Sequence, residues 1–220
     1  MKDLIFDHIA GFVQMDPAQT VKLCDTWFDG DYNAVARALK EQKDLSFNFL
    51  HTVLLQNEHK IIAECENSQH MQGYRPSQKY IDLLLHFVEI LCNKKHRSRI
   101  VDFVQRSYFP IDESLRICEE KQALEACAVL CRRNQDYNRA IELYTQVLVD
   151  LGTTIVHTLF DVTLQDMDKS NEHIQRFDEI LGHIVRICDK QSSRFAKREQ
   201  EDLWKHALKH VFSIKRQVFD

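Results

Sequence analysis

The sequence predicts an all-α protein, an α-solenoid in which antiparallel helix hairpins are stacked in a row. Three observations lead to this fold class. Apolar residues recur at spacings of three and four, the period of an α-helix, along nearly the whole chain. The 220 residues include five glycines and three prolines, too few for the many turns of a β-rich fold. A short motif also recurs at a distance that is typical of helix-hairpin repeats.

The recurring motif is Asp-Tyr-Asn, which occupies residues 31–33 and again residues 136–138. The offset is 136 − 31 = 105 residues, or three units of 35, and repeats of about that length mark solenoids of helix hairpins. Both copies follow a polar turn and open an amphipathic helix. We expect Asp136 to cap its helix and Tyr137 to pack into the neighbouring hairpin.

The first half of the chain is expected to contain several helices joined by short turns. Asp16-Pro17 is a strong start signal, because the aspartate caps a helix whose first residue is proline. A longer helix is expected from Asp44 to about Asn67, either continuous or broken near Gln56-Asn57. Residues 68–75 are predicted to form a mobile loop. The other helices expected here span residues 3–14, 17–28, 32–39, 76–93 and 100–104.

The second half continues the same pattern. Pro110 ends the preceding segment, and a break at Lys121-Gln122 separates the helix that follows from one rich in small residues over 123–131. Small side chains such as Ala126 let neighbouring helices approach closely. An apolar pattern then runs from Tyr137 to residue 164 and is either kinked or divided near Gly152. A polar turn at 166–171, a helix over 174–187 and a last helix over 203–218 complete the prediction.

Several of these features together resemble a known family. An aromatic residue and a proline, Phe109-Pro110, precede a helix, and a helix with alanines at its contact positions follows. Asp-Tyr-Asn and then Ala140-Ile141-x-x-Tyr144 come next, and an acidic segment leads into Leu203-Trp204 near the end. This order is similar to the clathrin heavy chain repeat, the α-solenoid module of vesicle coats and of class C vacuolar sorting subunits. The likeness covers about half of the chain and is strongest to the subunit specific to the CORVET complex.

The resemblance implies a scaffold and protein-interaction segment in a subunit of an endosomal or vacuolar membrane-tethering complex, CORVET or HOPS. It implies other subunits of that complex as partners and, through the full-length protein, small GTPases. It also implies a cytoplasmic protein that associates only peripherally with endosomal or vacuolar membranes. Residues 1–220 are then expected to be a single solenoid segment of a longer chain, with a β-propeller before it and a RING-type zinc domain after it. The alternative is an α-solenoid scaffold of another coat, transport or nuclear-pore complex.

Composition narrows the function classes. The net charge of −4 argues against broad nucleic-acid binding, and no apolar run reaches the length of a membrane span. The first residues carry acids within their apolar stretch, unlike a signal peptide. The seven cysteines form no Cys-x-x-Cys pair, so we expect small buried hydrophobic residues in a reducing compartment.

No motif of a known catalytic or cofactor site occurs, so neither enzymatic activity nor a cofactor is expected. An α-helical enzyme of unrecognised type is the remaining alternative. His206 and His210 are four residues apart, a spacing that can bind a metal, but we expect them to lack a nearby third ligand. We therefore interpret both histidines as packed or solvated. Asp166 and Asp168 lie in a polar stretch that lacks the pattern of a calcium loop.

Two surfaces are candidates for binding. On the last helix, apolar residues at spacings of three and four predict one face that packs inward and onto the next repeat or a partner subunit, with Trp204, Leu208 and Phe212 as its binding residues. The alternative is that this helix lies on an acidic membrane through its lysines, which acids preceding the helix disfavour. A basic turn is a weaker candidate for contact with anionic lipid, although such turns are usually only solvated. Its four cations are Lys94, Lys95, Arg97 and Arg99.

Overall fold

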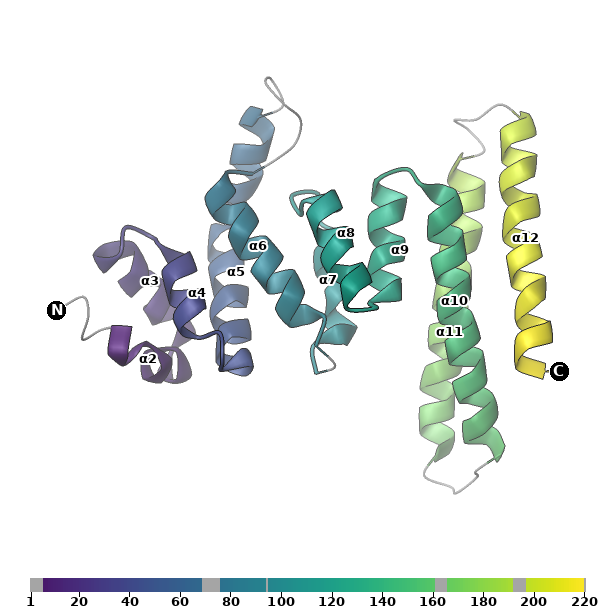
Figure 1. The fold of residues 1–220 in the computed structure, drawn as a ribbon, viewed down its shortest axis with the longest axis horizontal. Helices are drawn as coiled ribbons and strands as arrows, with labels where there is room; N and C mark the ends of the chain where they lie inside the picture. Colours follow the sequence, from purple (N-terminus) through teal and green to yellow (C-terminus); the bar gives the residue numbers. More distant parts are fainter. Residues whose placement is uncertain (1–5, 69–75, 94, 161–165, 192–196, 220) are drawn as a thin grey trace. The chain divides into compact units, whose positions relative to one another are not determined.

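A computed structural model describes residues 6–68, 76–93, 95–160, 166–191 and 197–219 of the chain (Figure 1). Within these ranges the chain forms α-helices α2 to α12 and one 3₁₀ helix, η1, and no strand. The predicted all-α fold class is therefore confirmed. The expected mobile loop lies outside the described residues except for Ser68, which ends a helix.

The chain divides into two compact units, residues 1–121 and residues 122–220. Each unit has its own helix packing and is described by itself. The expectation of a single continuous solenoid over residues 1–220 stays a prediction.

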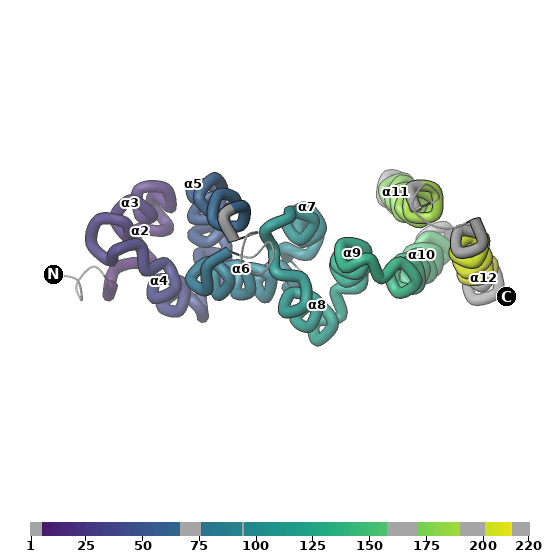
Figure 2. Tube along the Cα trace, turned by 90° about the horizontal axis from the view of Figure 1, so that it is seen from above, coloured from purple at the N-terminus to yellow at the C-terminus, as the bar shows by residue number. Residues whose placement is uncertain are grey.

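The first unit is a two-layered set of helix hairpins. Viewed end-on, α3, α5 and α7 lie on one side, and α4, α6 and α8 lie on the other (Figure 2). Helix α5 packs against α3 and α6, and α6 packs against α4 and α8, as expected for stacked hairpins. The helices span Ile9–Met15 (α2), Pro17–Trp27 (α3), Tyr32–Ala38 (α4), Lys43–Ser68 (α5), Gln78–Leu91 (α6), Arg97–Arg99 (η1), Ile100–Val104 (α7) and Ile111–Glu120 (α8).

The start signals read from the sequence form the expected caps. Asp16 precedes α3, and its Oδ1 accepts hydrogen bonds from the backbone N–H groups of Ala18 at 2.9 Å and Gln19 at 3.0 Å. Asp31 precedes α4, and its Oδ1 accepts one from the N–H of Ala34 at 3.1 Å. These carboxylates satisfy donors that have no partner within the helix itself.

Helix α5 is continuous, so the alternative of a break near Gln56-Asn57 is wrong. Asn57 is buried but makes two hydrogen bonds through Nδ2, to the carbonyl oxygen of Val53 at 2.9 Å and to the hydroxyl of Tyr32 at 3.4 Å. The Tyr32 hydroxyl in turn donates to Asp25. A buried amide is tolerated in this helix because its hydrogen-bonding groups find partners.

Arg106 ties the segment before α8 to α5. Its Nη1 lies 2.6 Å from Oε1 of Glu58 and 3.0 Å from the hydroxyl of Tyr108, which also donates to that carboxylate at 3.1 Å. Burial raises the pKa of Tyr108 to about 12, so it remains a hydroxyl donor at neutral pH. Pro110 then precedes α8 at the position expected from the sequence.

The second unit is organised around one long helix, α10. It packs against each of the other three helices of the unit. Ala126 and Ala140, on α9 and α10, are fully buried, in agreement with small residues at the contact between these two helices. The helices span Leu124–Arg133 (α9), Tyr137–Phe160 (α10), Asp166–Gln191 (α11) and Lys197–Phe219 (α12).

The second Asp-Tyr-Asn copy repeats the local geometry of the first. A residue with positive φ precedes each capping aspartate, Gly30 with φ 66° in the first copy and Gln135 with φ 63° in the second. The Oδ1 of Asp136 accepts from the N–H of Arg139 at 3.2 Å, as Asp31 does from Ala34. The two copies therefore share a turn-and-cap structure as well as three letters. Tyr137 is half-buried.

Three expectations for this unit were wrong. Helix α10 continues past Gly152, so the alternative of a division there is wrong, whereas a kink there stays a prediction. The hydroxyls of Thr153 and Thr154 donate to carbonyl oxygens one turn earlier. The predicted polar turn at 166–171 is instead the start of α11, and α12 begins at Lys197. The physical reason is that acids are favourable in the first turns of a helix, where they face the positive end of its dipole, so a polar stretch there need not be a turn.

Candidate functional site

The apolar residues of α12 do not form a single buried face. Leu203 and Ala207 are buried, and α12 packs against α10. Trp204 is half-buried, whereas Leu208 is 46% and Phe212 70% exposed. Leu208 and Phe212 thus lie largely outside the stripe that meets α10, and the expectation that they pack onto the next repeat or a partner subunit stays a prediction. Their exposure leaves them open to solvent in this unit, and their role in protein binding stays a prediction.

Acids on α12 lie within the helix and not before it. Glu201 and Asp202 are exposed residues of its first turns, and Asp202 lies 3.4 Å from Nζ of Lys205, one turn later. The first turns of α12 therefore carry both acidic and basic side chains on their exposed surface. An exposed pair of this kind contributes at most about 1 kcal/mol to stability.

The described side chains of the basic turn contact other residues of the first unit. Nζ of Lys95 lies 2.6 Å from Oδ2 of Asp44, and this hydrogen bond is the main reason that the pKa of Asp44 is lowered. An Nη atom of Arg97 donates to the carbonyl oxygen of Lys121 at 3.3 Å, and the guanidinium of Arg99 lies 5.4 Å from the centre of the Phe47 ring. Lys94 lies outside the described residues. The three described side chains each contact a different residue of the first unit, and their contact with lipid stays a prediction.

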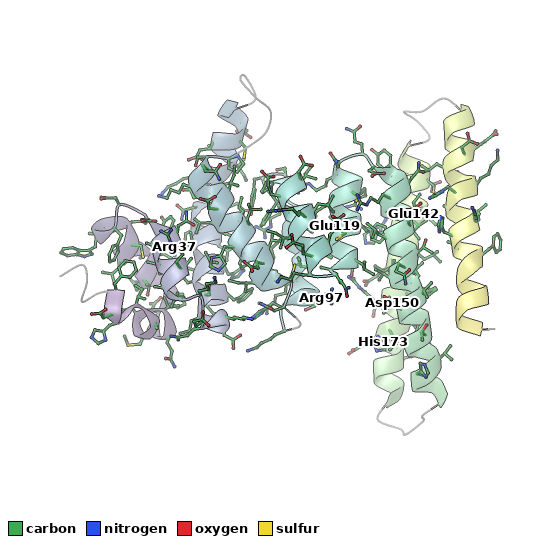
Figure 3. The ribbon with its side chains drawn as sticks, viewed as in Figure 1. Arg37, Arg97, Glu119, Glu142, Asp150 and His173 are labelled. Carbon is green, nitrogen blue, oxygen red and sulfur yellow. The ribbon has the colours of Figure 1, made fainter. Side chains whose placement is uncertain are left out.

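A cluster that the sequence did not reveal lies between α10 and α12. Oε1 of Glu142, on α10, is 3.4 Å from Nε2 of His206 and 4.0 Å from Nε2 of His210. The expectation that these histidines lack a nearby third ligand is therefore wrong. Glu142, which is labelled on α10 in Figure 3, is far from them in the sequence. It becomes their neighbour through the packing of α10 against α12.

All seven cysteines are buried and none forms a disulfide, in agreement with the interpretation of small hydrophobic residues. Burial raises the pKa of Cys188, in the second unit, to about 11, and that of Cys65, in the first, to about 11. Such thiols are protonated at neutral pH and are poor nucleophiles. Among the described residues, no helix is both long enough and apolar enough to cross a bilayer.

One comparison with known proteins finds a relative. The chain is similar to the vacuolar protein sorting-associated protein 8 homolog of mouse. The two are 21% identical over 203 residues, which cover 90% of this chain and 13% of the mouse protein. No protein-family model matches the chain, and no solved structure matches it. The similarity thus joins nearly all of an all-α chain to a small part of a much longer vacuolar sorting protein.

Proposed function

We propose that this chain is an α-solenoid segment of a membrane-tethering subunit, and that it works as a scaffold for protein interactions in endosomal or vacuolar trafficking. The observation that carries the proposal is the similarity to a vacuolar sorting protein over 90% of the chain. Two-layered helix hairpins in the first unit support it, because stacked hairpins present extended surfaces suited to binding. On this proposal the chain has no catalytic role.

The proposed partners are other subunits of a CORVET- or HOPS-type complex, with small GTPases reached through the full-length protein. The proposed location is cytoplasmic, with peripheral association at endosomal or vacuolar membranes. Seven buried, unbridged cysteines fit a reducing compartment. The alternative, a scaffold of another coat, transport or nuclear-pore complex, uses the same fold and differs in its partners.

The exposed residues of α12 are the proposed docking face. Leu208 and Phe212 expose apolar surface on one side of a helix whose other side is already packed on α10. Burying such side chains against a partner is favourable by about 25 cal/mol per Å² of apolar surface. Trp204, half-buried on the same helix, extends this face.

A capture experiment with the whole chain tests the proposal. The immobilised chain is incubated with purified core subunits of the class C tethering complexes and with small GTPases, and binding of at least one core subunit is expected. Coat or nuclear-pore scaffold subunits serve as the comparison, and binding to these alone would favour the alternative. Absence of binding to any core subunit contradicts the proposed function.

Matched variants then test the docking face. Leu208→Glu and Phe212→Glu are expected to abolish capture, whereas Leu55→Glu is expected to leave it unchanged. Leu55 is a fair control because it is 48% exposed on a long helix of the other unit, close to the 46% of Leu208. If capture survives both α12 variants, the partner binds elsewhere. Salt-sensitive flotation with anionic liposomes that is lost on Lys205→Glu and Lys209→Glu would instead indicate direct membrane contact.

A further inference from the structure

The cluster of Glu142, His206 and His210 has the composition of a transition-metal site. His206 and His210 are one helical turn apart on α12, so both rings lie on the same side of that helix. Their ring centres are 4.5 Å apart. Glu142, labelled in Figure 3, comes from the neighbouring helix α10. One ligand atom from each of the three residues lies within 4.8 Å of the other two.

The imidazole of His206 has an unsatisfied nitrogen. Its Nε2 is shielded from solvent and has no hydrogen-bond partner among the described residues, although Glu142 Oε1 lies 3.4 Å away. Leaving a buried polar atom without a partner is unfavourable, because the atom has given up its hydrogen bonds to water. A metal ion placed between this nitrogen and the carboxylate would satisfy both.

The distances also suit a metal. In a tetrahedral zinc site with bonds of about 2.0–2.1 Å, neighbouring ligand atoms are about 3.3–3.4 Å apart. The His206–Glu142 separation of 3.4 Å already has that value. The His210–Glu142 separation of 4.0 Å is wider by a few tenths of an ångström, which a small side-chain rotation closes, since Glu142 is an exposed residue.

We propose that Glu142, His206 and His210 bind a divalent transition-metal ion such as Zn²⁺, and that the bound ion holds α10 and α12 together. Two imidazoles and one carboxylate favour Zn²⁺ and similar ions over Mg²⁺ or Ca²⁺, which prefer all-oxygen sites. The three protein ligands leave a fourth position for water. The site is structural in this proposal, and it does not depend on the proposed function.

A zinc titration of the whole chain tests the proposal. The affinity tag and any bound metal are removed beforehand. Isothermal titration calorimetry with ZnCl₂ should show one site, and zinc should raise the unfolding midpoint of the second unit. Trp204, the single tryptophan of that unit, reports its unfolding when Trp27 is replaced by Phe. MgCl₂ in place of ZnCl₂ should produce neither effect.

Conservative variants show whether zinc binds at these three residues or elsewhere in the chain, for example at the buried thiols. Glu142→Gln, His206→Gln and His210→Gln should each weaken zinc binding at least about tenfold, because the loss of even an outer-shell partner costs about 10–100-fold. His59→Gln, at an exposed histidine of the first unit, should leave it unchanged. Circular dichroism shows whether each variant folds, and at least one folded variant is enough for the comparison. No zinc binding by the unmodified chain, or unchanged binding in folded Glu142→Gln and His210→Gln, would overturn the proposal.

Discussion

Replacing Ala126 by leucine tests the close packing of α9 against α10. The substitution adds three carbon atoms at a site that is completely buried. If space existed there, the added apolar surface would stabilise the fold by about 0.8 kcal/mol per buried CH₂. In a close-packed contact the added volume forces strain instead, with a net cost of about 1–3 kcal/mol. The sign of the change therefore distinguishes a tight contact from a loose one, and we expect a loss.

Urea unfolding of the chain, followed through Trp204 after replacement of Trp27 by Phe, measures this loss. With a slope of about 2 kcal/mol per molar urea, typical for a small protein, the midpoint should fall by about 0.5–1.5 M. Ala140→Leu should behave in the same way, because Ala140 is equally buried.

Ala63→Leu is the matched control, since Ala63 is exposed within α5. Surface substitutions of this kind stay within about 0.5 kcal/mol, and its effect on the first unit is followed through Trp27 with Trp204 replaced by Phe. An Ala126→Leu variant that is as stable as the unmodified chain would show that our account of the α9–α10 contact is wrong.

Two further predictions concern a helix cap and a half-buried histidine. Asp16→Ala should destabilise the first unit by about 1 kcal/mol because two backbone donors of α3 lose their acceptor. Urea unfolding followed through Trp27 measures this, with Asp16→Asn, which also caps helices, expected to retain most of the stability. Burial, with Arg186 and other arginines, lowers the pKa of His183, so the folded state keeps it neutral while the unfolded chain protonates it below about pH 6.5. Its contribution to stability is thus present above that pH and lost as the pH falls toward the folded pKa. His183→Gln should reduce the drop in melting temperature between about pH 7.5 and 5.5, and an unaltered drop would contradict the assignment.

The helices and their caps could be predicted from the sequence because they depend on neighbours a few residues away. The helical spacing of apolar residues predicted α6 and α10, and Asp16 with Pro17 predicted the start of α3. The starts of α11 and α12 were not predicted, because neighbouring residues alone are ambiguous there. A polar stretch suits both a turn and an exposed first turn of a helix, and composition alone does not separate the two.

Features that depend on contacts between helices could not be predicted. The period of α12 shows that Leu203 and Leu208 are apolar helix residues, but only the position of α10 decides that the first is buried and the second exposed. The neighbourhood of Glu142 and His206 has the same origin. A carboxylate on one helix and an imidazole on another carry no sequence signal of their proximity until the two helices are packed together.

The central position of α10 has a consequence for how the second unit opens. Because α9, α11 and α12 each pack against it, any one of them can detach while the remaining contacts of α10 persist. The backbone amides in the middle of α10 are thus exposed to solvent only when the whole unit comes apart, whereas those of α9 and α12 are reached by smaller local openings. In hydrogen exchange the slowest amides of the unit are then those of α10, and their rates report its global free energy of unfolding.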